Sequence, residues 1–298
     1  MYRFILSSLA AVLLAGCGKN PSEPAPSNET PSDRRTFQVK GVVIELEADG
    51  KTARIKHEEI PGYMAAMTMP LEVRDTNELA GLEPGDSISF RMIVTEDDGW
   101  IDQVRKLDVP RVNVAPTSGP FRLVRDVEPL NEGDALPEYR FIDQNGKPIS
   151  TAQYKGGALA INFIFTRCPF PTFCPLMAKH FAETQNRLLS SPASPTNWHL
   201  LSLTIDPEFD SPPLLKSYGG MYGQKPAHWT FATGELIDIT AIAEQFGLTF
   251  FRDTNGLPSH NLRTVVIDAA GRVQKNFIGN EWSPDELVQE MIKAAGAK

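Results

Sequence analysis

A nearly unbroken apolar run, GALAINFIF at residues 157–165, constrains the fold of this chain more than any other feature. A strand with one solvated face alternates between apolar and polar residues, so a run without alternation predicts a strand that is buried on both faces. The residues that follow, PLMAKHFAETQNRLL, have the periodicity of a helix. A strand buried on both faces and followed by a helix predicts a layered α/β domain.

The same alternation continues to the end of the chain. Strands are predicted at WHLLSLTI and WTFAT, helices at PPLLKSYGGMYG and LIDITAIAEQFG, and a hairpin at RTVVIDAAGRVQKNFIG with its turn at Ala270-Gly271. The segment SPDELVQEMIKAAG predicts a closing helix, because Ser283 and Glu286 have the spacing of a capping box. We therefore assign residues 132–298 to one α/β domain.

An earlier part of the chain has a different pattern. From Thr36 to about Val109, short apolar segments are separated by turn signals such as Asp49-Gly50 and Pro84-Gly85-Asp86. About five strands in so short a segment are typical of a small all-β barrel. We assign residues 36–110 to this barrel and residues 111–131, which contain Pro116, Gly119 and Pro120, to a linker.

The first residues predict export rather than structure. Arg3 is followed by an apolar run that ends near Cys17 and is too short for an ordinary membrane span. The residues LAGC resemble a bacterial lipobox, which implies a signal peptide at 1–16 and lipidation of Cys17. Residues 17–35 are rich in Pro, Ser and charge and predict a flexible tether. We expect a lipid-anchored protein on the periplasmic side of the cell envelope; the alternative is a plain signal peptide with a chance cysteine.

Charge and cysteine count narrow the function. The formal net charge of −8, without a basic stripe, argues against a nucleic-acid partner. The chain has three cysteines, so if Cys17 carries lipid, only Cys168 and Cys174 remain. One disulfide between these nearby residues would add little stability to a domain with a sizeable core. Redox or metal chemistry is therefore favoured over an inert disulfide.

The two thiols lie between the buried strand and the helix, in the segment FTRCPFPTFCP. Pro175 suits the first turn of a helix, which places Cys174 at the helix N-terminus. The helix dipole and free amides there favour a thiolate at Cys174, and Arg167 adds positive potential. Two adjacent thiolates suit Cu(I), and they suit reversible disulfide formation equally well.

Residues from about 133 onward resemble the SCO/SenC family of thioredoxin-like copper proteins. The matching pieces are INFIFTRCP, CPLM, LTIDPEFDSP and SHNLRTVVIDAAGRV. The resemblance implies a thioredoxin-like fold and a copper site formed by Cys168, Cys174 and His260, with Asp206 at the position of a family acid. Two thiolates and an imidazole suit Cu(I) or Cu(II). One departure is that five residues separate the cysteines here, where the family usually has three. The longer spacer leaves redox work open as an alternative.

The barrel carries its own cluster of soft donors, in the segment HEEIPGYMAAMTMP. Met67 and Met69 are two residues apart, so on a strand their side chains lie on the same face. Thioethers select Cu(I), but methionines also serve as flexible core fillers, and spacing alone favours neither interpretation.

This segment also resembles the metal motif of CusF-like periplasmic copper-binding domains, which are small OB-type barrels. The resemblance implies that His57, Met67 and Met69 bind Cu(I) or Ag(I) under an aromatic ring. Met64 stands near the position of that ring, with Tyr63 beside it. Tyr63 is therefore a candidate for the ring, and Met64 is a candidate for a further ligand.

Both resemblances point to copper, and together they predict an OB-like barrel followed by a thioredoxin-like domain. We expect a copper carrier that passes the metal by ligand exchange. By analogy with the family, the recipient is the binuclear copper centre of a cytochrome c oxidase, and the alternative is another copper protein. The alternative is an enzyme, a thiol–disulfide oxidoreductase in which Cys168 is the attacking thiol. A third interpretation is a copper-resistance buffer that uses mainly the barrel.

Overall fold

The structure is a computed structural model that describes residues 34–113, 127–252 and 258–297. The predicted signal peptide, Cys17 and nearly all of the predicted tether lie outside the described residues, as does much of the predicted linker. Residues Arg34–Lys298 cluster as one compact unit. Within the described ranges, no helix has the length and apolar character needed to cross a membrane.

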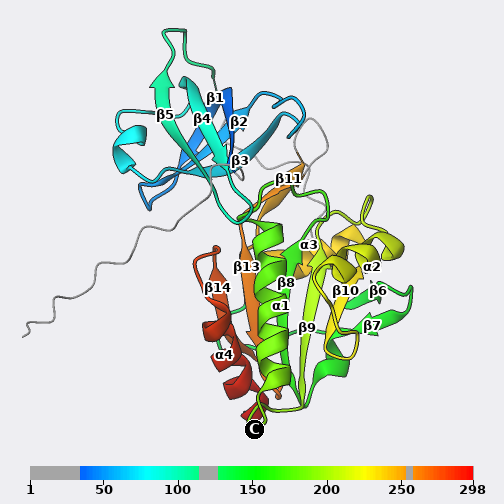
Figure 1. The fold of residues 1–298 in the computed structure, drawn as a ribbon. Helices are drawn as coiled ribbons and strands as arrows, with labels where there is room; N and C mark the ends of the chain where they lie inside the picture. Colours follow the sequence, from blue (N-terminus) through cyan, green and yellow to red (C-terminus); the bar gives the residue numbers. More distant parts are fainter. Residues whose placement is uncertain (1–33, 114–126, 253–257, 298) are drawn as a thin grey trace, which may run out of the picture. The chain divides into compact units, whose positions relative to one another are not determined.

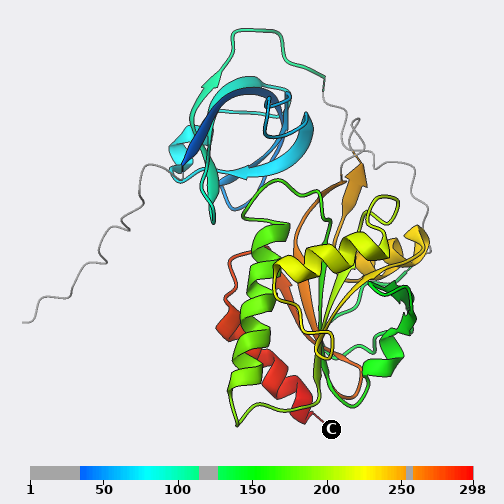
Figure 2. The same cartoon turned by 45° about the vertical axis from the view of Figure 1, so that its right-hand side comes forward.

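The N-terminal domain is a five-stranded antiparallel sheet with the order β3-β2-β1-β4-β5, and it curls around a common interior (Figure 2). Its two edge strands meet at a single parallel bridge, Val73 to Ile101, so the barrel is not closed by a full ladder. The sequence prediction of five short strands is confirmed. The strands are β1 (Arg35–Leu46), β2 (Thr52–His57), β3 (Met67–Glu72), β4 (Ser87–Val94) and β5 (Gly99–Lys106), with a short 3₁₀ helix at Thr76–Leu79.

A buried carboxylate just before β4 holds the end of β5 and the segment that follows it. Asp86 is 1% exposed and accepts hydrogen bonds from Lys106 Nζ at 2.7 Å and from Arg111 Nε at 2.7 Å. The backbone amide of Glu83 also donates to it, at 2.9 Å. Lys106 foremost, together with the Glu83 amide and Arg111, lowers the pKa of Asp86 to about 2 against the effect of burial.

We expect Asp86→Asn to lower the free energy of unfolding at neutral pH. The carboxyl pKa is about 2 in the folded protein and near 4 in an unfolded chain. Its contribution is therefore complete above about pH 4 and is lost as the pH falls through about 2. Urea unfolding of the wild type and of Asp86→Asn across this pH range should show that the difference in their free energies of unfolding shrinks in acid. Asp108→Asn, at an exposed carboxylate of the same segment, should show no comparable trend.

The C-terminal domain is built on a seven-stranded mixed sheet with the order β14-β13-β8-β9-β10-β6-β7. The central strands β8, β9 and β10 are parallel, and the flanking strands run antiparallel. Its strands are β6 (Arg140–Asp143), β7 (Pro148–Ser150), β8 (Ala158–Ile164), β9 (Trp198–Thr204), β10 (Trp229–Thr233), β13 (Arg263–Ile267) and β14 (Val273–Ile278). Every residue of β8 is buried, as its unbroken apolar run predicts.

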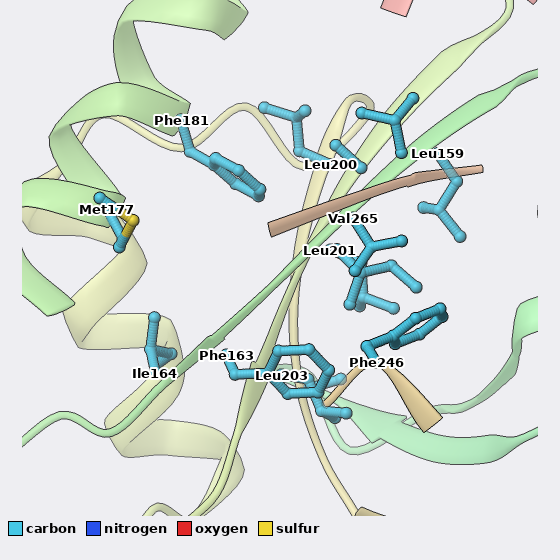
Figure 3. Packing of buried hydrophobic residues seen from close by; sticks show 14 of the residues in the cluster. Leu159, Phe163, Ile164, Met177, Phe181, Leu200, Leu201, Leu203, Phe246 and Val265 are labelled. Atoms are coloured by element: carbon cyan, nitrogen blue, oxygen red, sulfur yellow. The ribbon is translucent and has the colours of Figure 1, made fainter. Parts of the chain in front are cut away.

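Helices cover both faces of this sheet, which is the layered arrangement of a thioredoxin-like fold (Figure 1). Helices α1 and α4 contact each other and β8, and α2 contacts β10. Figure 3 shows Met177 and Phe181 of α1 on one side of the strands and Phe246, which ends α3, on the other. The helices are α1 (Cys174–Ser190), α2 (Pro212–Met221), α3 (Leu236–Gln245) and α4 (Pro284–Gly296), with a 3₁₀ helix at Thr151–Tyr154.

Two local predictions are confirmed, and two small pairs of strands were missed. Ser283 caps α4 in a capping box with Glu286, and the β13–β14 turn has Gly271 at φ +81°. The β6–β7 hairpin and the pair β11 (Phe250–Arg252) and β12 (Pro258–His260) were not predicted. These strands have three or four residues each, which is too short for an alternating pattern to be recognised.

Candidate metal centre

The two thiols occupy the junction between β8 and α1. Cys168 lies in the turn that follows β8, and Cys174 is the first residue of α1, with Pro175 in the first turn as predicted. Both are free thiols, and they are hydrogen-bonded to each other. Cys174 is fully buried, whereas Cys168 is half-buried. The five-residue spacer therefore does not prevent contact between the two sulfur atoms.

The thiolate preference is the reverse of the prediction made from the helix N-terminus. Burial raises the pKa of Cys168, but hydrogen bonds from the Cys174 thiol, from the Cys174 amide and from the Phe170 backbone outweigh it, so the pKa falls below its usual value. Burial and the neighbouring Cys168 raise the pKa of Cys174 well above its usual value. The prediction of a thiolate at Cys174 was wrong, because the first amide of the helix serves the sulfur of Cys168.

His260 ends strand β12 and faces the thiols. Its Nε2 lies 3.7 Å from Cys174 Sγ. Its Nδ1 lies 2.7 Å from the carbonyl oxygen of Asn261, which can only accept, so Nδ1 carries the proton and Nε2 holds a free lone pair. Burial lowers the pKa of His260 to about 4, although the Asn261 hydrogen bond opposes the shift. The low pKa keeps the ring neutral. A neutral imidazole fixed in one tautomer by a carbonyl is the form that binds metals.

Arg167 and Asp206 form an ion pair beside the thiol turn. The guanidinium lies 2.6 Å (Nη2) and 3.2 Å (Nε) from Asp206 Oδ2, and it stacks over the Phe209 ring at 4.0 Å. The side chain of Asp206 is fully buried. The positive charge predicted to act on the thiols is therefore compensated by Asp206, and the pair holds the turn after β8 against the loop after β9.

Sequence reasoning missed Asp210, which lies four residues beyond Asp206. Its buried carboxylate accepts from Thr166 Oγ1 at 2.5 Å, from Thr166 N at 3.1 Å and from Thr204 Oγ1 at 2.5 Å. Burial raises its pKa, although these hydrogen bonds oppose the shift. Thr166 is two residues before Cys168, so Asp210 positions the thiol turn. A second buried acid in the phrase LTIDPEFDSP was the available signal.

Asp210→Ala is expected to destabilise the domain by about 1–3 kcal/mol, because it leaves buried hydroxyl and amide donors without their acceptor. Chemical denaturation of the purified protein measures the change. Glu208→Gln, which alters an exposed acid in the same loop, is the matched control and should stay within about 0.5 kcal/mol of the wild type. Equal stability of the Asp210→Ala and wild-type proteins would contradict the positioning role.

The register of the barrel strands gathers the predicted histidine and methionines. His57 pairs directly with Met67 across β2 and β3, and Ile55 pairs with Met69, so all four side chains lie on one face. His57, Met67 and Met69 are 2%, 4% and 3% exposed. The His57 Nδ1 lies 2.6 Å from the carbonyl oxygen of Glu58, which leaves the lone pair on Nε2, as in His260.

The other two candidates of the barrel lie differently. Met64 is 4% exposed and forms a backbone bridge with Ile60, and it belongs to the buried cluster of the barrel. The Tyr63 ring stacks on Phe37 with a centroid distance of 4.8 Å, and Arg35 lies over it at 4.6 Å. The Tyr63 ring therefore packs against Phe37 and Arg35. Tyr63 does not line the small cavity that Met67 and Met69 border.

One small cavity brings donors of both domains together. Met67, Met69, Cys168 and His260 all line a cavity of about 20 Å³. Cys174 stands behind it in contact with His260, and His57 lies beside Met67. In the described ranges, His, Cys, Asp and Glu nowhere form a group of three or more that could hold a metal ion. Met67 and Met69 add two thioethers to the thiols and the imidazole that are gathered here.

Two family profiles match the chain. The SCO1/SenC profile matches residues 127–296, and that of the copper-binding periplasmic protein CusF matches residues 36–106. These matches identify copper as the metal of the chain. They cover the two domains separately.

Relatives and solved structures agree with these matches. An SCO1 protein homolog of Bacillus subtilis (strain 168) is 29% identical over 178 residues, which is 57% of this chain and 87% of the relative. The structure of an SCO1/SenC family lipoprotein from Bacillus anthracis is 28% identical with a TM-score of 0.50, over 56% of this chain and 97% of that chain.

A second solved structure is that of BsSco, described as a member of the Sco family of cytochrome c oxidase assembly proteins. It is 24% identical with a TM-score of 0.48, over 58% of this chain and all of that chain. The SCO1/SenC profile alone spans more than half of the residues of this chain. The chain therefore belongs to the SCO1/SenC family and carries a CusF-like domain ahead of the SCO region.

Proposed function

We propose that this protein is a lipid-anchored copper carrier of the cell envelope that holds Cu(I) with Cys168, Cys174 and His260. The observation that carries the proposal is the approach of His260 Nε2 to Cys174 Sγ, at 3.7 Å, with its lone pair fixed by the carbonyl of Asn261. Two sulfur atoms and one neutral imidazole nitrogen form a donor set that is soft enough for Cu(I).

The carrier role follows from how these donors are held. Cys168 is half-buried, so a partner protein can reach one ligand while Cys174 and His260 keep their hold from behind. A lowered pKa at Cys168 favours the thiolate that binds the metal. Copper can then leave by ligand exchange, in which a donor of the recipient replaces Cys168 first.

The recipient that we propose is the binuclear copper centre of a cytochrome c oxidase. Its support is membership of a family whose member BsSco is described among cytochrome c oxidase assembly proteins. The lipid anchor rests on the LAGC segment that ends at Cys17, and a family relative from Bacillus anthracis is described as a lipoprotein. An anchor would keep the carrier at the membrane surface where its recipient is assembled.

A second candidate function is thiol–disulfide exchange. The observation that favours it is the unequal pair, a half-buried Cys168 with a lowered pKa in front of a buried Cys174 with a raised pKa. In this function Cys168 attacks a partner disulfide, and Cys174 then displaces the partner from the mixed disulfide. Two protein thiols become one disulfide, and the partner leaves with two reduced thiols.

His260→Ala separates the two functions. A carrier is expected to lose at least about 10-fold in Cu(I) affinity, because the imidazole is a direct ligand. Thiol–disulfide exchange with a small disulfide should stay nearly unchanged, since the attack of a thiolate on a disulfide sulfur does not require the ring. Competition with a chromogenic Cu(I) chelator and the rate of reduction of the small disulfide measure the two properties. His228→Ala, at a histidine that stacks on Trp198, is the matched control.

Unchanged Cu(I) affinity in His260→Ala would contradict the proposed ligand set. If thiol exchange then also remained fast, the oxidoreductase function would be favoured. If His260→Ala lost both Cu(I) affinity and thiol exchange, its unfolding transition would be compared with that of His228→Ala. A lowered transition would indicate misfolding, and an equal transition would indicate loss of the ligand.

A further inference from the structure

The segment between the two cysteines packs against the other domain. Phe170 is 2% exposed and belongs to the buried cluster of the barrel, although it comes from the thiol turn. The hydroxyl of Tyr63 donates to the carbonyl oxygen of Pro169 at 3.1 Å. The long spacer between the cysteines thus places one of its rings among the side chains of the N-terminal domain.

Gly99 provides the space for that ring. A Cβ atom built on Gly99, the first residue of β5, would lie 2.5 Å from Phe170 Cζ and 3.0 Å from Cε1. Real Cβ atoms do not approach other carbon atoms so closely, so only glycine fits while Phe170 remains in place. The contact is therefore shaped from both domains, by a large ring on one and a missing side chain on the other.

This contact brings the two donor sets to one place. Strand β3, which carries Met67 and Met69, is in contact with β12, which carries His260. The side chains of these three residues and of Cys168 line the same cavity. Phe170 lines it too.

The size and chemistry of the cavity fit a single soft ion. A volume of about 20 Å³ is close to that of one water-sized sphere. Four of its lining residues carry a sulfur atom or an imidazole, namely Met67, Met69, Cys168 and His260. The remaining lining residues are Pro70, Phe165, Pro169, Phe170, Phe173, Pro258 and Ser259. No carboxylate lines it, which disfavours Ca²⁺ or Mg²⁺ and favours a monovalent soft ion such as Cu(I).

We propose that Met67 and Met69 of the N-terminal domain and Cys168 and His260 of the C-terminal domain form one shared Cu(I) site, which Phe170 closes. This inference rests on the proposed function and adds that the two domains hold the same ion rather than one ion each. Within this one site the ion shifts between the methionine end and the thiol–imidazole end of the cavity, without release to solvent.

The transfer is a ligand exchange without electron transfer. Copper–thioether bonds to Met67 and Met69 break as bonds to the sulfur of Cys168 and to the imidazole nitrogen of His260 form, and copper stays Cu(I) throughout. Where Cys168 begins as a thiol, its proton is released to water when the copper–thiolate bond forms. Both donor sets stay on the protein, so the exchange reverses by the same path.

The test uses the full chain with Cys17→Ser, so that only two thiols remain, and Cu(I) itself as the probe. Affinity for the first equivalent is measured anaerobically against a chelator. A shared site predicts that Met67→Ala/Met69→Ala and Cys168→Ser each weaken this same equivalent by about 10-fold or more. Met221→Ala, which removes a 73% exposed thioether, should leave it unchanged.

The contact itself is tested from both sides. Phe170→Ala and Gly99→Val should each weaken the first equivalent, and a thermal unfolding scan shows whether either variant is misfolded. If the methionine pair leaves the first equivalent unchanged while Cys168→Ser weakens it, the sites are separate and the inference is overturned, although the proposed function stands. If the Cys17→Ser protein binds no Cu(I) at all, the proposed function fails with it.

Discussion

Replacing both Cys168 and Cys174 with serine is expected to weaken Cu(I) binding by more than about 100-fold. Loss of a residue that only hydrogen-bonds to a metal ligand already weakens metal binding by about 10–100-fold, and these two residues are themselves ligands. The two sulfur atoms are in hydrogen-bond contact with each other, and His260 Nε2 lies 3.7 Å from the sulfur of Cys174. A serine hydroxyl at either position would not ionise and is a poor ligand for a soft ion. Chelator competition under anaerobic conditions measures the loss.

The control for this prediction is Cys17→Ser, which removes the only other cysteine of the chain. It should leave Cu(I) affinity unchanged, and the proposed lipid anchor predicts that it also releases the protein from the membrane. Wild-type affinity in the double serine variant would mean that the thiols hold no copper. The barrel methionines would then have to carry all binding, as the copper-resistance interpretation requires.

Trp229→Ala should destabilise the C-terminal domain by about 3–5 kcal/mol, which is a large share of the stability of a typical domain. Trp229 is fully buried, and its ring lies 4.9 Å from Phe231 and 5.9 Å from Phe181 between centroids. Its Nε1 donates to Ser202 Oγ at 3.0 Å, so truncation also leaves a buried hydroxyl without this donor. Urea or thermal unfolding monitored by circular dichroism gives the change.

Ile278→Ala serves as the comparison, because Ile278 is 71% exposed in the same sheet. Its effect is expected to stay within about 0.5 kcal/mol. A small effect for Trp229→Ala as well would show that the interior around β10 relaxes to fill the space, and it would contradict the close packing described for this core.

Much of the fold was predictable because local signals and tertiary packing agree. The run at 157–165 lacks polar alternation because β8 is one of the central strands of the sheet, with layers on both of its faces. Ser283 and Glu286 predicted the start of α4 because the capping contacts are made within one helical turn. The barrel strands were predicted from turn residues such as Gly50 and Gly85, whose positive φ angles are +70° and +91°.

The ordering of the two thiols was not predictable from the sequence. Position at the helix N-terminus predicted a thiolate at Cys174, but that residue is fully buried and its amide donates toward Cys168. Which sulfur receives the amide depends on how the five-residue spacer folds back, and that path is set by long-range contacts. The role of Asp210 was hidden for the same reason, since its partner Thr166 is 44 residues away in the chain.

The approach of the methionines to the thiols was also hidden from the sequence. It depends on Phe170 fitting beside Gly99, two residues that are 71 positions apart and carry no motif in common. The family resemblances supplied His57, Met67, Met69 and His260 as separate ligand sets. A resemblance to two separate families holds no information on a contact between their members.

X-ray absorption at the copper edge, on the Cys17→Ser protein loaded with one equivalent of Cu(I), tests the central claim most directly. Soft sulfur donors held in place by the fold predict a first shell dominated by sulfur, with one nitrogen at most and no change of oxidation state on loading. A shell made of oxygen and nitrogen atoms without sulfur would contradict the account.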